Sequence, residues 1–279
     1  EKMDLESVLK SVAMEDKTVI LTNLNEAWIE DKSIFELFLT SFELGNQTAL
    51  LRHLVVLCFD RKAFEYCIEK KLHCYGLESE RDVDLSHEAK FMTEAYLKIV
   101  FRKIDLLRKV LQLGYNFLFT DADIMWLRNP FPNLHPNTEF QLSSDHYRGD
   151  PSAADNDANT GFLYVKSTPR TIGFFKLWYD SREAYPEKND QEVFNELKFD
   201  PAAGLPIKYL DTAYFGGFCE PSRDLNLVLT MHANCCVGLE NKIHDLKILL
   251  QDWRSYLAIP ASTKRNQAPP PWSPRRCKP

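Results

Sequence analysis

Two aspartates separated by one residue, Asp121 and Asp123, lie between an apolar run at 115–119 and another at 124–127. Aspartate is disfavoured in strands and is seldom buried without a partner, so this pair needs compensation. A divalent cation supplies it, because carboxylates suit hard ions such as Mg²⁺ and Mn²⁺, which proteins often hold together with substrate phosphates. A polar turn at a strand end is the alternative, since so short a motif also occurs by chance.

Two later residues could join such a site. His232 follows the apolar run 228–231, and its imidazole would add a nitrogen ligand, a combination that suits Mn²⁺ at least as well as Mg²⁺. A satisfied core histidine is the alternative interpretation. Lys242 lies on a predicted helix after His232, where an ammonium can meet phosphate as a point charge. A solvated helix face is the alternative for this lysine.

The elements that must position these residues alternate between strands and helices. Residue patterns predict strands at 17–22, 50–59 and 115–119 and helices at 33–44, 61–70 and 86–113. This alternation predicts a parallel α/β sheet with right-handed crossovers, in which ligands bind beyond the carboxyl ends of the strands. Thr22 and Asn23 end the first strand, so we expect them to share a crevice with Asp121 and Asp123.

The second half of the chain is less regular. Residues 141–157 are polar and predict a long loop, followed by a strand at 162–165 and helices at 169–179, 190–197 and 240–257. Asn189 or Asp190 can cap the middle one of these helices. The tail from residue 260 is Pro-rich and basic, which predicts an extended conformation. We therefore predict one domain over 1–259 and a C-terminal tail over 260–279.

Composition limits the class of protein. The 279 residues are 44% hydrophobic and carry a net charge of −6, so the chain can bury a sizeable core and is not expected to bind nucleic acid. No apolar stretch approaches the ~20 residues that cross a bilayer. The seven cysteines lack zinc spacing, and because their number is odd at least one is free or pairs with another chain. Asn46 begins a glycosylation sequon, a slight indication of a secretory compartment, so a cytosolic and a lumenal chain both remain open.

Several other site motifs fail. A calcium loop starting at Asp155 would need Gly and Glu where Thr160 and Lys166 stand. The phosphate-binding Gly-x-x-x-x-Gly-Lys loop, the dinucleotide Gly-x-Gly-x-x-Gly motif and the hydrolase Gly-x-Ser-x-Gly motif are absent from the sequence. The polar residues that follow apolar strands are what remains.

The segment 113–131, LGYNFLFTDADIMWLRNPF, resembles plant glycosyltransferase family 77, which includes the rhamnogalacturonan II xylosyltransferases and the extensin arabinosyltransferases. The likeness continues in order through 19–25, 159–162, 189–192 and 231–236, and the order is also similar to that of the glycogenin-like transferases. The resemblance implies a GT-A type of nucleotide-sugar transferase fold, with a Rossmann-like mixed central sheet flanked by helices. It also implies a nucleotide-sugar donor, Mn²⁺ or Mg²⁺ as cofactor, and retention at the anomeric carbon.

The resemblance assigns roles to individual residues. Asp121, Asp123 and His232 match the metal ligands of the family. The positions implied to bind the donor are Thr22, Asn23, Ala122, Asp145, Asn159, Gly161, Gly238 and Lys242, together with the two aspartates. Lys242 departs from the glycogenin-like pattern, because it lies farther from His232 and no Pro-Trp follows it. One of Lys98, Arg102 and Lys103 is also implied to reach the phosphate; the sequence does not say which, and Arg102 is kept among the donor-binding candidates.

Asp190 and Gln191 match the pair beside the anomeric carbon, which makes them the catalytic candidates. Loss of the nucleoside diphosphate leaves an oxocarbenium-like sugar, and a carboxylate on its far face would stabilise or attack it. Asp190 is the preferred residue and Gln191 the alternative. A covalent intermediate and a same-face displacement, in which the leaving phosphate is the base, both remain open.

The resemblance thus implies a retaining, metal-dependent glycosyltransferase that moves a sugar from a UDP-sugar to a cell-wall polysaccharide or glycoprotein acceptor. The sugar would be a pentose such as arabinose or xylose, or galactose. A catalytically inactive carbohydrate-binding protein and a metal-dependent nucleotide-sugar hydrolase are the alternatives. The family also implies a type II membrane protein in the Golgi lumen, whose N-terminal anchor would be missing from this sequence.

Overall fold

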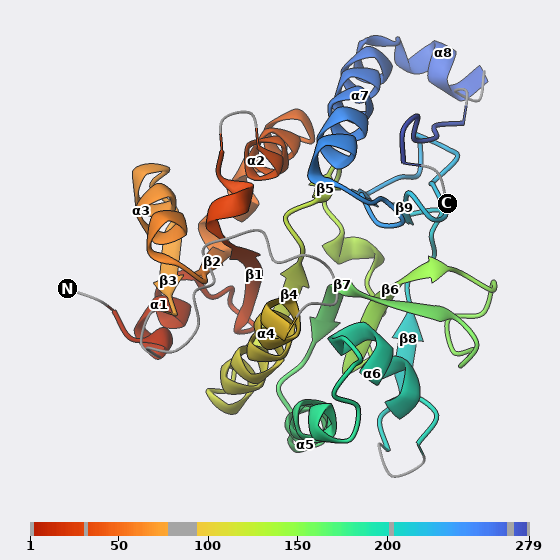
Figure 1. The fold of residues 1–279 in the computed structure, drawn as a ribbon. Helices are drawn as coiled ribbons and strands as arrows, with labels where there is room; N and C mark the ends of the chain where they lie inside the picture. Colours follow the sequence, from red (N-terminus) through yellow and green to blue (C-terminus); the bar gives the residue numbers. More distant parts are fainter. Residues whose placement is uncertain (1–2, 31–32, 78–93, 201–203, 267–270, 278–279) are drawn as a thin grey trace.

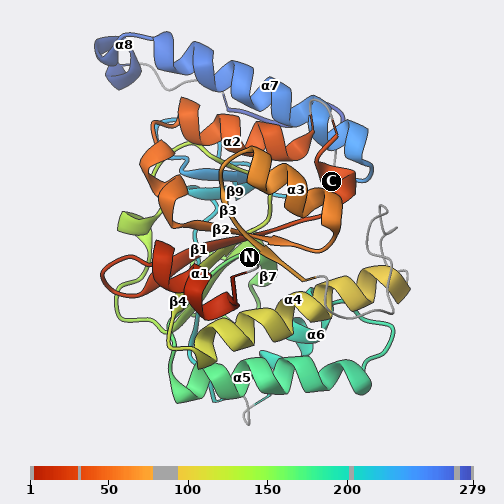
Figure 2. The same cartoon turned by 90° about the vertical axis from the view of Figure 1, so that its left-hand side faces the viewer.

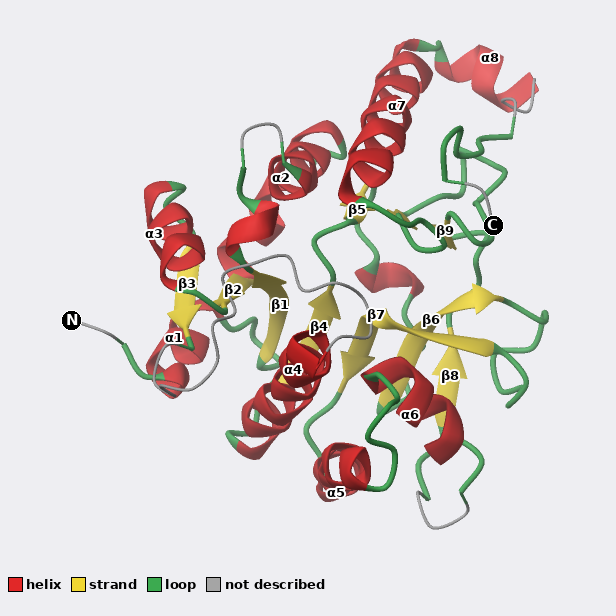
Figure 3. Cartoon of the chain, viewed as in Figure 1, coloured by secondary structure: helices red, strands yellow, loops and turns green. Residues whose placement is uncertain are grey.

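Seven strands form a central sheet in the computed structural model, which describes residues 3–30, 33–77, 94–200, 204–266 and 271–277. The strands are β1 Thr18–Leu24, β2 Leu54–Cys58, β3 His73–Gly76, β4 Asn116–Thr120, β6 Phe140–His146, β7 Asp157–Val165 and β8 Ile207–Tyr209. Their order is β3-β2-β1-β4-β7-β6-β8, as Figures 1 and 3 show. Strands β1 to β4 run parallel, whereas β7 is antiparallel to both β4 and β6. The α/β class and the mixed central sheet are therefore confirmed.

A second, three-stranded sheet lies beyond the carboxyl end of β4. It consists of β5 Ile124–Trp126, β9 Phe215–Gly217 and β10 Thr230–His232 in the order β5-β10-β9. Strand β10 pairs antiparallel with β5, and His232 is opposite Ile124 in the register. Because Ile124 directly follows Asp123, this pairing brings the histidine to the two aspartates.

Helices cover both faces of the central sheet (Figure 2). They are α1 Leu5–Val12, α2 Ile34–Leu44, α3 Arg61–Glu69, α4 Glu94–Gln112, α5 Pro169–Asp180, α6 Asp190–Leu197, α7 Leu239–Ala258 and α8 Ala261–Asn266. One hydrophobic cluster joins the sheets to α2, α3 and α7, and another joins the central sheet to α1, α4, α5 and α6. Alternate residues of β1 supply the two clusters, since Ile20 lies in the first and Val19 and Leu21 lie in the second.

Most predicted elements are confirmed within a few residues of their bounds. The helix predicted over 86–113 is observed as α4, which ends two residues before Gly114 at φ 85°, while residues 86–93 lie outside the described ranges. Asn189 is the cap of α6: its side chain accepts from the Glu192 N–H at 2.9 Å, and the Glu192 carboxylate accepts from the Asn189 N–H at 2.8 Å. This reciprocal capping explains why α6 begins at Asp190.

Two local predictions are wrong in part. The loop predicted over 141–157 is observed at 147–156, but its first residues belong to β6, which runs through His146, and its last residue, Asp157, begins β7. The polar side chains in this hairpin are satisfied by the opposite strand: Ser143 and Ser144 donate to the carbonyls of Asn159 and Asp157 at 3.2 and 2.8 Å. The strand predicted over 50–59 begins only at β2, since Thr48–His53 forms a 3-10 helix. The polar composition of 141–157 was misleading because pairing between strands outweighs local propensity.

The C-terminal tail is not extended as predicted. It contains α8, and Trp272 is buried with its ring 5.3 Å from that of Phe218. A disulfide joins Cys277 to Cys236, and two others join Cys67 to Cys74 and Cys219 to Cys235. Among the described cysteines Cys58 is free and buried, which agrees with the odd count. The division into a domain and a tail at residue 260 stays a prediction. None of the described helices is both long and apolar enough to span a membrane.

Candidate active site

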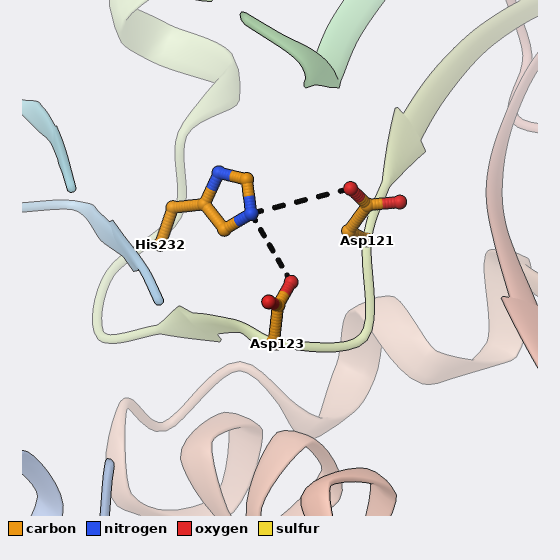
Figure 4. Close-up of side chains that lie close together, drawn as sticks. All are labelled: Asp121, Asp123 and His232. Atoms are coloured by element: carbon orange, nitrogen blue, oxygen red, sulfur yellow. Dashed lines mark ion pairs between the residues drawn. The ribbon is translucent and has the colours of Figure 1, made fainter. Parts of the chain in front are cut away.

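Asp121 and Asp123 lie in the turn between β4 and β5, at the carboxyl end of the central strand β4. The Asp121 N–H donates to the carbonyl of Gly161 on β7 at 2.7 Å, which fixes the start of the turn. Nε2 of His232 lies 3.1 Å from Asp123 Oδ1 and 4.0 Å from Asp121 Oδ2 (Figure 4). One ligand atom from each of the three residues lies within 4.8 Å of the others. The pairing of β10 with β5 thus assembles the predicted metal ligands.

This cluster fits a divalent cation. Asp123 is only 2% exposed, yet no donor among the described residues is aligned to hydrogen-bond with its Oδ1. Gly161 leaves space beside the cluster, since a Cβ there would lie 2.6 Å from Asp121 Oδ2 and 2.7 Å from His232 Cε1. Carboxylate oxygens with one imidazole nitrogen form a donor set that suits Mn²⁺ or Mg²⁺.

Lys242 adds a positive charge to the cluster. It lies in the first turns of α7, after the cap residue Gly238 at φ 90°, and its Nζ is 2.7 Å from Asp123 Oδ2. Burial would raise the pKa of Asp123, but the charges of Lys242 and His232 outweigh it and hold that pKa well below its usual range. Burial and the neighbouring Asp123 raise the pKa of Asp121 to about 6, although Lys103 and His232 oppose the shift. The two carboxylates therefore differ in how readily they are deprotonated.

The proposed catalytic carboxylate, Asp190, lies across β7 from this cluster, at the first residue of α6. Its Oδ2 is 2.7 Å from Lys103 Nζ and accepts from Thr160 Oγ1 at 3.3 Å. Lys103 is buried on α4, and although burial would lower its pKa, the charges of Asp190 and Asp121 raise it. Burial, together with the charges of Asp190 and Asp121, also raises the pKa of Tyr96. Thr160 is the middle residue of the motif Asn159–Gly161, which the resemblance placed at the sugar hydroxyls, whereas Tyr96 was not among the predicted site residues.

Asp145 forms the third part of the site, at the end of β6. Its Oδ1 accepts from Asn159 Nδ2 at 2.8 Å and from Asn234 Nδ2 at 2.6 Å, and its Oδ2 accepts from Gln191 Nε2 at 3.3 Å. Three residues predicted to bind donor or to catalyse, Asp145, Asn159 and Gln191, are thus in direct contact. Asn234 was not among the predicted site residues, although it lies in the segment 231–236 that carries the resemblance, two residues after His232.

Of the remaining predicted residues, some lie at the same end of the sheet as the cluster and some are held elsewhere. The pairing of Leu21 with Phe119 leaves Thr22, which is buried, and Asn23, which is half-buried, at the same sheet edge as Asp121. Arg102 is placed otherwise: its guanidinium donates to the backbone carbonyl of Leu77 at 2.5 Å. Among the basic residues considered for the phosphate, Lys103 pairs with the catalytic candidate Asp190.

Comparison with known proteins bears on this arrangement. A family model described as nucleotide-diphospho-sugar transferase matches residues 49–246, a range that contains every site residue from Asp121 to Lys242. The uncharacterized Arabidopsis thaliana protein At4g15970 is 47% identical over 264 residues, which cover 93% of this chain and 70% of that protein. Arabinosyltransferase RRA2 of Arabidopsis thaliana is 28% identical over 220 residues, covering 71% of this chain and 48% of that protein. The Arabidopsis thaliana UDP-D-xylose:L-fucose alpha-1,3-D-xylosyltransferase 3 is 24% identical over 181 residues, covering 55% of this chain and 47% of that protein.

Proposed function

Because the chain belongs to the nucleotide-diphospho-sugar transferase family, we propose that it is a retaining, metal-dependent glycosyltransferase with a UDP-sugar donor. The observation that carries this proposal is the division of the site into two charged halves. Asp121, Asp123 and His232, which could hold a cation, lie on one side of β7, and Asp190 is paired with Lys103 on the other. A donor laid across Gly161 would have its diphosphate at the first half and its anomeric carbon near the second.

Each half has a separate task in the proposed reaction. When bound, a divalent cation supplies Lewis-acid chemistry at the departing diphosphate. The ammonium group of Lys242, 2.7 Å from Asp123, would stabilise the negative charge of the same departing diphosphate. Asp190 stabilises the positive charge that develops on the sugar, and Lys103 and Thr160 hold its carboxylate in place. A nucleophilic Asp190 and a same-face displacement would each retain the anomeric configuration.

The proposed donor sugar is a pentose such as arabinose or xylose, or galactose, and the proposed acceptor is a cell-wall polysaccharide or glycoprotein. The names of two similar proteins support the pentose: one is an arabinosyltransferase and one uses UDP-D-xylose. The resemblance of residues 113–131 to plant family 77 supports the acceptor class.

The test is release of UDP from a panel of UDP-sugars, with and without Mn²⁺, Mg²⁺, chelator and candidate glycan acceptors. We expect one donor to be turned over in a Mn²⁺-dependent way, faster with acceptor, and Asp121→Ala to abolish turnover. Asp155→Ala, which removes an exposed aspartate, is the matched control. Equal rates with and without acceptor would indicate a hydrolase, and donor binding without turnover would indicate a binding protein. Metal-independent turnover, or normal turnover by Asp121→Ala, would contradict the assignment.

We also propose that the chain functions in the Golgi lumen as part of a type II membrane protein. Three intramolecular disulfides among the described cysteines support an oxidising compartment. In such a compartment Asn46 would be glycosylated, because it and Thr48 are exposed, and Asn46 lies in a turn after α2 at φ 54°. The natural full-length protein should show a glycosidase-sensitive shift on a gel, lost in Asn46→Gln and kept in Thr48→Ser. A natural protein without a glycan at Asn46 would count against this compartment.

A further inference from the structure

Three side-chain amides converge on the carboxylate of Asp145, and they come from three different segments. Asn159 belongs to β7, Gln191 to α6, and Asn234 to the segment that follows β10. Their nitrogens donate to Asp145 at 2.8, 3.3 and 2.6 Å respectively. None of the ion pairs among the described residues includes Asp145, so its partners are neutral donors and not a lysine or arginine. Because the three amides carry no charge, they do not neutralise the carboxylate, which can still accept a hydrogen bond from a ligand.

The orientation of each amide follows from its other contact. The side-chain oxygens of Asn159, Gln191 and Asn234 accept from the backbone N–H groups of Gly161, Thr160 and Cys219 at 2.9, 3.2 and 3.2 Å. A flipped amide would put its NH₂ against an N–H and its oxygen against the carboxylate, which loses two hydrogen bonds at once. The backbone therefore determines that all three nitrogens face Asp145.

Counting acceptor positions shows what Asp145 can still bind. An ionised carboxylate has two oxygens with about four acceptor positions in all. Oδ1 accepts from both asparagines and Oδ2 from Gln191, so the described contacts leave one position, on Oδ2. Gln191 itself lies next to Asp190, the catalytic candidate. The open position is thus suited to one hydroxyl of a sugar at the reacting centre.

Asn234 connects this carboxylate to the metal half of the site. It lies two residues after His232, the last residue of β10, whereas Asp145 belongs to the central sheet. Two features hold Asn234 in place. The Cys219–Cys235 disulfide joins Cys235, the residue after Asn234, to Cys219, whose backbone N–H donates to the side-chain oxygen of Asn234. Gly217 provides the space, because a Cβ there would be 2.4 Å from Asn234 Oδ1.

We propose that Asn234 is a positioning residue for the transferred sugar, a role that rests on the function proposed above. Its hydrogen bond fixes the position of Asp145 relative to His232. The open position on Asp145 Oδ2 then holds a sugar hydroxyl at a fixed distance from the diphosphate at the metal half of the site. Gly217 is part of the same device, since a side chain there would displace Asn234. The effect is on the orientation of the sugar, so turnover depends on Asn234 more than binding of the nucleotide does.

The experiment compares donor kinetics and UDP binding in the wild type, three test variants and one control variant. Asn234→Ala should lower kcat about 10- to 100-fold, the amount expected for one hydrogen bond to a charged group, with KM for the UDP-sugar and the affinity for UDP and Mn²⁺ within about threefold. Asn234→Asp keeps the shape and the contact with Cys219 but replaces the donor by an acceptor, so it should lose at least as much. Gly217→Ala should reproduce the loss, whereas Gly173→Ala, where a Cβ meets nothing within 4 Å, should not.

A double-mutant cycle separates positioning from a general structural role. If Asn234 acts through Asp145, the double variant Asp145→Ala with Asn234→Ala should be no slower than Asp145→Ala alone. Additive losses, or a wild-type kcat in a folded Asn234→Asp protein, would overturn the inference. A loss of UDP affinity as large as the loss of kcat would also overturn it. If the wild type turns over no UDP-sugar, it is the proposed function that fails, and this inference with it.

Discussion

Asp123 and Asp245 are both buried carboxylates, exposed to 2% and 0%, but they are stabilised in different ways. Oδ2 of Asp245 accepts from three successive backbone N–H groups of the tail, those of Arg275, Arg276 and Cys277, at 2.8 to 2.9 Å. Its Oδ1 lies 2.8 Å from Nδ1 of His244. Asp123 instead has Lys242 at one oxygen and His232 near the other, and its Oδ1 has no aligned donor.

The difference separates a structural carboxylate from one suited to chemistry. The backbone N–H groups that donate to Asp245 hold the C-terminal tail against α7. Around Asp123 a second carboxylate, Asp121, lies close enough to His232 to share it, and burial together with the charge of Asp123 raises the pKa of Asp121 to about 6. Two carboxylates placed together repel each other, and the cation proposed above would offset that repulsion.

The largest effect should come from removing the charge of Asp123. Asp123→Asn takes away a ligand charge worth several kcal/mol to the leaving diphosphate, so we expect kcat/KM to fall about 1,000-fold or more. Stability should also fall, because the lowered pKa of Asp123 means that its pairs with Lys242 and His232 favour the folded state. Donor turnover and thermal unfolding measure the two outcomes. A strongly destabilised protein with near-normal turnover would reverse the distinction drawn between Asp123 and Asp245.

Gly161→Ala should weaken the metal site without changing any ligand. The added Cβ would lie under 3 Å from both Asp121 Oδ2 and His232 Cε1, so the ligands must move apart. We expect the affinity for Mn²⁺ to fall about 10- to 100-fold, as for other changes that misorient ligands. Calorimetric titration with Mn²⁺ measures this, with Gly173→Ala on α5 as the control. Unchanged affinity would show that the ion binds elsewhere.

Acid should affect the two carboxylate sites at different pH. Because the pKa of Asp121 is raised to about 6 and, despite burial, that of His232 is also raised by Asp123 and Asp121, protons compete with the metal for both ligands, and Mn²⁺ affinity should fall as the pH is lowered from 7 to 5. The pKa of Asp245 is lowered from 3.8, since backbone and His244 hydrogen bonds outweigh burial. Its contribution to stability is therefore present above pH 3.8 and lost only as pH falls through the lowered value. Mn²⁺ titrations and thermal unfolding between pH 4.5 and 7.5 test this; equal Mn²⁺ affinity at pH 5 and 7 would contradict it.

The smallest effect on activity should come from Asp245→Asn. Loss of the charge weakens the hydrogen bonds from the tail, so we expect the free energy of unfolding to fall by about 1–3 kcal/mol. Turnover per folded molecule should stay at the wild-type value, because the Cys236–Cys277 disulfide still joins the tail to the segment near His232. Chemical denaturation and donor kinetics on the same sample measure both. A large loss of turnover with normal stability would place Asp245 in the site.

Much of the fold was predictable because it depends on neighbours in the sequence. The turn at Asp121, the cap at Asn189 and the start of α6 at Asp190 follow from patterns within about four residues. The strand β6 was not predictable in this way, because its serines and Asp145 find partners in distant segments, in β7, on α6 and after β10. The roles of the site residues in binding and catalysis stay predictions, whereas their positions are now described.

The sequence by itself determined which residue types are available and the order of most strands and helices, since propensity, capping and apolar periodicity are local. Only the tertiary structure decided which distant residues meet. Lys242 reaches Asp123 across 119 positions and Asn234 reaches Asp145 across 89. These contacts depend on the register of β10 against β5 and on the packing of α7, which no local pattern encodes. The predicted metal ligands could therefore be named from the sequence, but the contact of Asn234 with Asp145 could be found only in the folded chain.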